Sequence, residues 1–316
     1  MTYDVITIGS AALRDFTFLI DADKKNKSDD ICLPAGTKIN IREAYFTRGG
    51  GACNVAVGLA NFGIKVATVV RVGKDYSGQA IIDGLKNKKV DTQFVQVDKK
   101  SHTGVSVVIE PRGGDRTILT YRGANDNLEV KSEKLKNIKT KLVYLSTLSG
   151  NWQPMLTEIF NLKSRISNLK IAWNPSIIQL QAGKKKLAPF LRKTEILIVN
   201  RHEAAMLTGQ NEKNIALLLK SLAQLGPKII VITCGANGAY VMDQDEILYE
   251  DSRSTKIMDT TGAGDSFSSG FLAGLILWRD LGKALKLGIL NSAANLRIIG
   301  AQEGLLAKKD LQKLKI

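Results

Sequence analysis

A glycine-rich turn with an acidic residue is the part of the sequence best suited to chemistry. It covers residues 259–270, reads Asp-Thr-Thr-Gly-Ala-Gly-Asp-Ser-Phe-Ser-Ser-Gly, and leads directly into an apolar stretch at 271–278. Small residues at 262–264 let backbone N–H groups approach a ligand, and the following helix directs its positive end at the same place. The turn therefore suits an anion, and Asp265 adds a base beside it. A base next to a phosphate site indicates phosphoryl transfer.

The same turn has a simpler interpretation as an ordinary helix start with Asp265 as its capping residue. Other phosphate-binding motifs are missing from the sequence: no Gly-x-x-x-x-Gly-Lys-Ser/Thr occurs, and no Gly-x-Gly-x-x-Gly follows the first strand-like run. The sequence therefore excludes a P-loop fold.

A second glycine turn lies at 49–54, Gly-Gly-Gly-Ala-Cys-Asn, and leads into an apolar helix from residue 55. The alternative interpretation of this pattern is a tight hinge with a helix cap.

These turns must be positioned by regular elements, and the chain alternates between short β-rich runs and helix-length segments. The runs lie at 3–8, 142–146, 169–173, 195–199 and 228–232. Such alternation predicts a parallel sheet with helices on both faces, and ligands bind such sheets at the carboxyl ends of the strands. The polar groups that follow the last four runs should converge there: Ser149-Gly150-Asn151, Asn174-Pro175, Asn200-x-x-Glu203 and residues 233–238.

Four other segments show shorter, more alternating β patterns bounded by Gly, Pro and Asp. They are 16–20, 38–47, 103–110 and 116–122. We expect them to form a small lid of antiparallel strands outside the parallel sheet.

Composition narrows the functional class. The chain has 316 residues, of which 44% are hydrophobic, as in folded proteins. Three cysteines form no Cys-x-x-Cys pair and only two histidines occur, which argues against a zinc site. Neither a signal peptide nor an apolar run of membrane-spanning length is recognisable, so we expect a cytoplasmic protein. The net charge of +15 is spread over scattered lysines, which favours a solvated surface that attracts anionic substrates over a nucleic-acid interface.

Taken together, the two glycine turns resemble the two signatures of the ribokinase-like (pfkB) carbohydrate kinase family. Further motifs occur in the family's order: Asp15 after Ile8-Gly9-Ser10, Val72-Gly73-Lys74-Asp75-x-x-Gly78, Asn174-Pro175, Asn200-x-x-Glu203 and Thr233-x-Gly235-x-x-Gly238. The resemblance implies an α/β fold, a three-layer sandwich whose central sheet is mostly parallel, with a small β-sheet lid. It implies one domain over 1–316, with a lid of about 15–48 and 98–123 and a main part of 1–14, 49–97 and 124–316.

The resemblance also implies roles for the residues of both turns. Asp265 would accept the proton of the substrate hydroxyl, while the N–H groups of Gly262, Ala263 and Gly264 would stabilise the transferring phosphoryl group. The substrate-hydroxyl ligands of the family match Asp15, Gly50, Gly51 and Asn54.

ATP and cations follow from the resemblance in the same way. Thr233, Gly235 and Gly238 would lie against the nucleotide, Asn291 beside the adenine, and Asn200 near the phosphates. Glu203 would hold hydrated Mg²⁺ through water, although Asn200 and Glu203 also read as a helix cap. Asp259 and Thr261 match residues that in many members hold a monovalent cation, usually K⁺, with backbone carbonyls near 299–301.

The expected activity is ATP-dependent phosphorylation of a sugar hydroxyl. Many sugar kinases carry a lysine after the second glycine of the first signature, but Gly51-Ala52-Cys53 precede Asn54 here, so the acceptor stays open. A nucleoside kinase is one alternative, because lid aromatics offer a platform for a base: Phe16, Phe18, Tyr45, Phe46 and Tyr121. A sugar-phosphate kinase is another, because arginines in or beside the lid can clamp a phosphate: Arg14, Arg48, Arg112, Arg116 and Arg122.

Two non-catalytic associations complete the expectations. A silent regulator that binds nucleic acid is disfavoured, because it has no need of a base beside an anion site. Lid strands with exposed edges are compatible with a homodimer formed through the lid.

Overall fold

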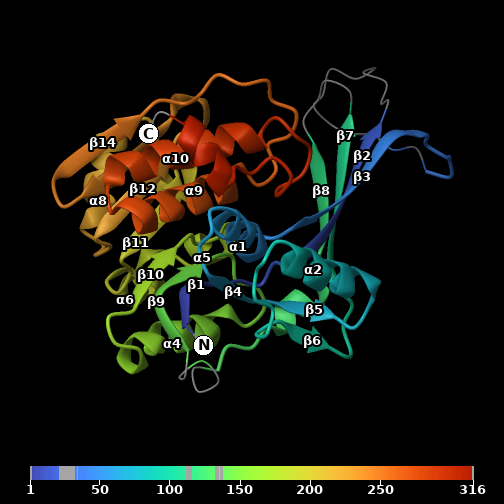
Figure 1. Ribbon diagram of the computed structural model, residues 1–316, viewed down its shortest axis with the longest axis horizontal. Helices are drawn as coiled ribbons and strands as arrows, with labels where there is room; N and C mark the ends of the chain where they lie inside the picture. The colour runs from blue at the N-terminus through green and yellow to red at the C-terminus, as the bar shows by residue number, and fades with distance from the viewer. Residues whose placement is uncertain are drawn as a thin grey trace.

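The computed structural model describes residues 2–20, 33, 35–111, 116–131, 135 and 138–314, and its centre is an eight-stranded sheet (Figure 1). The strand order is β14-β13-β12-β11-β10-β9-β1-β4. All neighbours from β12 to β4 are parallel, while β13 and β14 extend one edge as antiparallel strands. The strands are β1 (Thr2–Ile8), β4 (Val66–Val69), β9 (Lys139–Leu145), β10 (Lys170–Trp173), β11 (Ile196–Asn200), β12 (Ile229–Thr233), β13 (Ala239–Asp243) and β14 (Glu246–Glu250). The predicted α/β fold with a mostly parallel sheet is confirmed.

Helices cover both faces of this sheet and make three layers. One face carries α1 (Gly51–Asn61), α2 (Tyr76–Asn87), α9 (Ala263–Trp278) and α10 (Leu281–Asn295). The other carries α4 (Trp152–Arg165), α5 (Ile177–Gln181), α6 (Lys184–Leu191), α7 (Arg201–Thr208) and α8 (Ile215–Ala223). Strand side chains alternate between the two cores: Leu142 and Tyr144 pack on the α9 side, and Val143 and Leu145 on the α4 side. Because both faces are buried at its centre, the middle strands β10, β11 and β12 consist mostly of apolar residues.

A four-stranded sheet, here called the lid, projects from one side of this body (Figure 1). Its order is β3-β2-β7-β8, with β2 (Leu13–Ile20), β3 (Ile41–Gly49), β7 (Gly104–Pro111) and β8 (Thr117–Tyr121). The outer pairs are antiparallel as predicted, but the central pair, β2 with β7, is parallel. The prediction of a wholly antiparallel lid was therefore wrong. Both β2 and β7 run outward from the body, so they lie side by side in the same direction.

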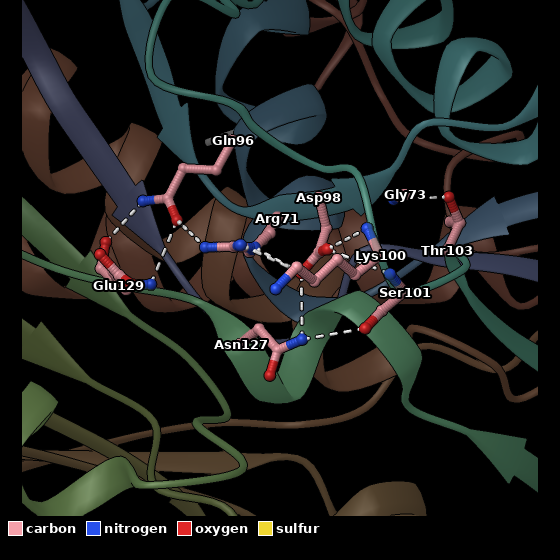
Figure 2. Close-up of polar contacts among 9 residues, drawn as sticks. All are labelled: Arg71, Gly73, Gln96, Asp98, Lys100, Ser101, Thr103, Asn127 and Glu129. Atoms are coloured by element: carbon pink, nitrogen blue, oxygen red, sulfur yellow. Dashed lines mark hydrogen bonds and ion pairs between the residues drawn. The ribbon is translucent and has the colours of Figure 1, made fainter.

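The base of the lid is held by the Asp98 carboxylate, which lies at the end of β6 (Gln96–Asp98), next to β5 (Arg71–Gly73) (Figure 2). Asp98 accepts hydrogen bonds from the N–H groups of Lys100 at 2.8 Å and Ser101 at 3.0 Å, and from Asn127 Nδ2 at 3.0 Å. Arg71 pairs with it at 3.0 Å. These donors hold the pKa of Asp98 well below its usual range. The segment that enters β7 is thereby tied to the one that leaves β8.

Asp75 and Asn125 fasten the same region. Asp75 caps α2 through the Gly78 N–H at 2.8 Å and also accepts the N–H of Thr103, just before β7, at 2.7 Å. Asn125, in the short helix η1 (Gly123–Asn127), exchanges two hydrogen bonds with the backbone of Ala12, just before β2. The motif at 72–78 therefore anchors the lid.

Two further short helices complete the described elements, η2 (Gly235–Asn237) and η3 (Lys308–Lys313). Within the described residues, every helix is too short or too polar to span a membrane.

Candidate active site

The predicted anion site lies at the first turn of α9, which begins just after Gly262. Gly262 has φ 74°, a left-handed conformation, and a Cβ there would meet Ala301. The Gly264 N–H is exposed and has no acceptor among the described residues, whereas the Ala263 N–H donates to the Thr260 carbonyl at 3.3 Å. The Gly262 N–H likewise has no acceptor among the described residues, so Gly262 and Gly264 are the members of 262–264 whose N–H groups are free to meet an anion.

Asp265 lies in the same turn and contacts the other glycine turn. Its Oδ2 accepts a hydrogen bond from Asn54 Nδ2 at 2.8 Å, which joins residues 211 positions apart. A Cβ on Gly51 would lie 3.2 Å from Asp265 Oδ1. Burial raises the pKa of Asp265, and the Asn54 hydrogen bond lowers it in part. The structure therefore brings the predicted base and the first glycine turn together.

Gln302 is a site residue that the sequence analysis missed. Its Nε2 donates to Asn54 Oδ1 at 2.9 Å, and both side chains are buried. Because this bond occupies the carbonyl end of the Asn54 amide, the NH₂ end is directed at Asp265. The result is a chain from Gln302 through Asn54 to Asp265 that fixes the donor to the base. Only the three-dimensional fold joins positions 54 and 302, so no local motif signals it.

Asp15 lies on the other side of the first glycine turn. Its carboxylate contacts Gly49. Burial raises the pKa of Cys53 in α1, and the charges of Asp265 and Asp15 raise it further. Burial raises the pKa of Asp15 to about 6, opposed by a hydrogen bond to Ser106 and reinforced by the charge of Glu303. Asp15 and Asp265 therefore both lie beside the first glycine turn, which suits a hydroxyl-binding site.

Gly50 is required by the fold of this turn. Its φ is 102°, and a Cβ there would overlap the carbonyl oxygen of Ala11. No other residue satisfies both constraints.

Asn200 and Glu203 form a reciprocal cap at the start of α7. Glu203 N–H donates to Asn200 Oδ1, and Asn200 N–H donates to Glu203 Oε2, both at 2.8 Å. The capping interpretation is therefore confirmed. Burial raises the pKa of Glu203, with the Asn200 hydrogen bond opposing the shift.

The two predicted glycines in the turn after β12, Gly235 and Gly238, have different surroundings. Gly235 has φ 59° with open space where a side chain would stand, whereas a Cβ on Gly238 would overlap the Glu250 carbonyl oxygen. Thr233 ends β12, half-buried, at the carboxyl edge of the sheet. Gly235 thus leaves room for a ligand, and Gly238 is required by the turn itself.

Asn291 is fully buried between α9 and α10. Its Nδ2 donates to the Ser266 carbonyl at 2.7 Å and to Ser269 Oγ at 3.1 Å, while its Oδ1 accepts the Leu306 N–H at 2.8 Å. The amide predicted beside the adenine is engaged within the protein, where it holds the helix that carries Asp265.

Asp259 and Thr261 meet a lid arginine. Arg116 Nη1 donates to Asp259 Oδ1 at 2.6 Å and to Thr261 Oγ1 at 2.8 Å. Asp259 also accepts the N–H groups of Thr261 at 2.8 Å and Gly300 at 2.9 Å. Burial would raise the pKa of Asp259, but these hydrogen bonds and the guanidinium lower it overall.

Four of the remaining lid candidates lie away from Asp15, whereas Tyr45 aligns with Thr17 and so shares the face of Asp15. Arg14 faces Arg48 across β2 and β3, and Phe16 faces Phe46 with ring centroids 5.4 Å apart. Side chains alternate along a strand, so these two pairs lie on the lid face opposite Asp15. Arg112 lies outside the described residues.

A cavity of about 680 Å³ lies at the base of the lid rather than at Asp265. Its lining includes Arg71, Asp98, Asn127 and Glu129, which are engaged with one another or with neighbouring groups (Figure 2). Across the described residues no group of three or more His, Cys, Asp or Glu side chains is placed to hold a metal ion.

The chain is similar to known proteins. Residues 6–308 match the pfkB family carbohydrate kinases. A protein of Thermoanaerobacterium thermosaccharolyticum named ATP-dependent 6-phosphofructokinase is 28% identical over 95% of this chain and 89% of its own length. Mouse ribokinase is 29% identical over 87% of this chain and 86% of its own.

Solved structures share the fold. Arabidopsis thaliana ribokinase, solved with ribose and ATP, superposes with a TM-score of 0.82 at 20% identity and covers 99% of this chain and 98% of its own. A nucleoside kinase of Methanocaldococcus jannaschii gives 0.79 at 22% identity and covers 98% and 97%. This chain belongs to the pfkB family of carbohydrate kinases, which transfer a phosphoryl group to a hydroxyl acceptor.

Proposed function

We propose that this protein is an ATP-dependent kinase that transfers the γ-phosphoryl group to a hydroxyl of a free sugar. One observation carries the proposal: the Asp265 carboxylate, oriented by Asn54 of the first glycine turn, lies in the same helical turn as the free N–H of Gly264. A base and an anion site are thus side by side, which phosphoryl transfer to a hydroxyl requires.

The residues divide the reaction between them. Asp15, Asn54 and the backbone of Gly50 and Gly51 would hold the acceptor so that one hydroxyl faces Asp265. Asp265 would take the hydroxyl proton as the new oxygen–phosphorus bond forms and the bond to the leaving ADP breaks. The raised pKa of Asp265 suits this step, because a stronger base accepts the proton more readily. The N–H groups of Gly262 and Gly264 would stabilise the charge on the transferring phosphoryl group.

The nucleotide would occupy the carboxyl edge of the sheet. Thr233 and the open side of Gly235 would lie against it, with Asn200 near the phosphates. Mg²⁺ neutralises phosphate charge when bound, and the half-buried Glu203 carboxylate offers oxygen chemistry that suits a water-mediated contact. Glu203 Oε2 is engaged by the Asn200 N–H, which leaves Oε1 for that contact.

The direct test combines an acceptor screen with a base variant. ADP release is measured with ribose, deoxyribose, fructose, fructose 6-phosphate, adenosine and cytidine. Asp265→Asn should abolish turnover with the best acceptor, and calorimetry should show ATP binding retained. Normal turnover by this variant would refute the assigned base. Gln224→Met, at an exposed position at the end of α8, serves as the matched control.

A sugar phosphate is a second candidate acceptor, because a relative that spans 95% of this chain is named 6-phosphofructokinase. Three of the candidate arginines are placed away from such a clamp: Arg14 and Arg48 lie on the lid face opposite Asp15, and Arg116 is paired with Asp259. Fructose 6-phosphate in the screen separates the two candidates.

The proposal extends to assembly. Exposed apolar side chains of the lid, Phe46, Ile118, Leu119 and Tyr121, support a homodimer formed through it. A cytoplasmic location remains a prediction from the sequence.

A further inference from the structure

The contact between Arg116 and the segment before α9 joins two parts of the molecule that are distant in sequence. Arg116 lies just before β8 of the lid, 143 positions from Asp259, and its guanidinium touches both Asp259 and Thr261. The Asp259 side chain is only 6% exposed and that of Arg116 is 27% exposed. A charge-assisted hydrogen bond of 2.6 Å between such groups is strong.

These contacts decide whether Asp259 and Thr261 fit a monovalent cation. Asp259 Oδ1 already accepts from Arg116 and Thr261 N–H, and Oδ2 accepts from Gly300 N–H. Thr261 Oγ1 accepts from the same guanidinium nitrogen. A cation placed on these oxygens would lie next to a permanent positive charge, which repels it. The residues therefore do not fit K⁺ while Arg116 is docked, and the expectation of a cation site does not suit this structure.

Acidic side chains near Asp259 make a positive charge favourable there. Burial raises the pKa of Glu110, near the end of β7; the charge of Asp259 raises it further, and that of Arg116 lowers it. Burial also raises the pKa of Asp15, and the charges of Glu303 and Asp259 add to that rise. Asp259 is thus one of several acidic groups near the start of α9, where an anionic phosphoryl group would be held. Without a counter-charge, these carboxylates would oppose that group.

We propose that the Arg116 guanidinium supplies this counter-charge, so that the lid itself replaces a bound monovalent cation and the kinase works without K⁺. The inference rests on the proposed function for its activity arm. It also links lid docking to the anion site, because Thr261 directly precedes Gly262 in the turn.

The activity test compares rates in KCl and in tetramethylammonium chloride at matched ionic strength. The natural protein should give equal rates in both salts. Arg116→Ala should lose about 10- to 100-fold in tetramethylammonium, the effect expected of one lost charged hydrogen bond, and should recover in KCl. Arg116→Lys should stay independent of K⁺. Arg253→Ala, which removes a surface arginine paired with Glu250, should match the natural protein.

A thermal-melting arm needs no turnover and so separates this inference from the kinase proposal. K⁺ should raise the melting temperature of Arg116→Ala above its value in tetramethylammonium, and should leave that of the natural protein unchanged. The inference is overturned if the natural protein responds to K⁺ in either arm. It is also overturned if Arg116→Ala melts identically in both salts, or if its lost activity does not return with KCl.

Discussion

The link from Gln302 to the base makes a sharp prediction, because it acts on Asp265 through Asn54 without touching substrate. Gln302→Met keeps the volume but removes the donor to Asn54 Oδ1, which lies 2.9 Å from Gln302 Nε2. A buried acceptor left without a partner costs about 1 to 3 kcal/mol. If that cost falls on the orientation of Asn54 in the transition state, kcat/KM for the acceptor drops about 5- to 150-fold.

The pH profile separates positioning from a merely structural effect. Asn54 donates to Asp265 and thereby lowers a pKa that burial has raised. Once Asn54 is free to turn, that pKa rises further, so the ionised base is lost at a higher pH as the solution is acidified. The acid limb of kcat/KM should therefore move to higher pH. Gln302→Glu, which replaces a donor with an acceptor, should move it further.

The assay is ADP release with ATP saturating and the acceptor varied across pH. Affinity for ATP should be unchanged, and Gln224→Met should retain the natural profile. The reasoning is refuted if Gln302→Met melts earlier but its acid limb coincides with that of the natural protein, since Gln302 would then only stabilise the fold.

Two further predictions concern the first glycine turn and the neighbouring Asp15. Gly50→Ala should destabilise the fold by at least about 3 kcal/mol, since it combines a strained φ with overlap on the Ala11 carbonyl. Denaturant unfolding measures this loss of stability. The control Gly183→Ala, at a position with φ 85° and open space for a side chain, should cost only about 1 to 2 kcal/mol. A similar loss in both variants would contradict the role given to the overlap. Asp15 has its pKa raised to about 6, so it becomes protonated as pH falls through that value. KM for the acceptor should then rise below about pH 6 while KM for ATP does not follow, and Asp15→Asn should remove the dependence; a dependence that persists in the variant would exclude Asp15.

Local patterns were enough to predict the body of the protein. The buried strands β9 to β12 are short apolar runs between helix-length segments, and their pairing follows from the geometry of parallel sheets. The cap formed by Asn200 and Glu203 was also readable, because its partners are three residues apart. In each case the controlling interaction lies within one element or between successive ones.

What escaped prediction depends on contacts between distant segments. The parallel pairing of β2 with β7 follows from the shared direction in which both strands leave the body, and no alternation pattern encodes that direction. Arg116 was visible as a lid arginine, but its partner Asp259 is far away in sequence, so a phosphate clamp explained it equally well. Asn291 matched a family position, yet its burial becomes apparent only when α9 and α10 are packed together.

The parallel pair at the centre of the lid has a consequence for protein engineering. Leu13 of β2 aligns with Gly104 of β7, so the lid is assembled from two separate stretches, β2 with β3 and β7 with β8, with α1 and α2 between them in the sequence. No single contiguous segment can be exchanged to transplant this lid onto a related kinase. A chimera must receive both excursions, together with Ala12 and Asn125, whose mutual hydrogen bonds join the two. Exchange of one stretch alone would leave a parallel edge without its partner, and such an edge invites aggregation.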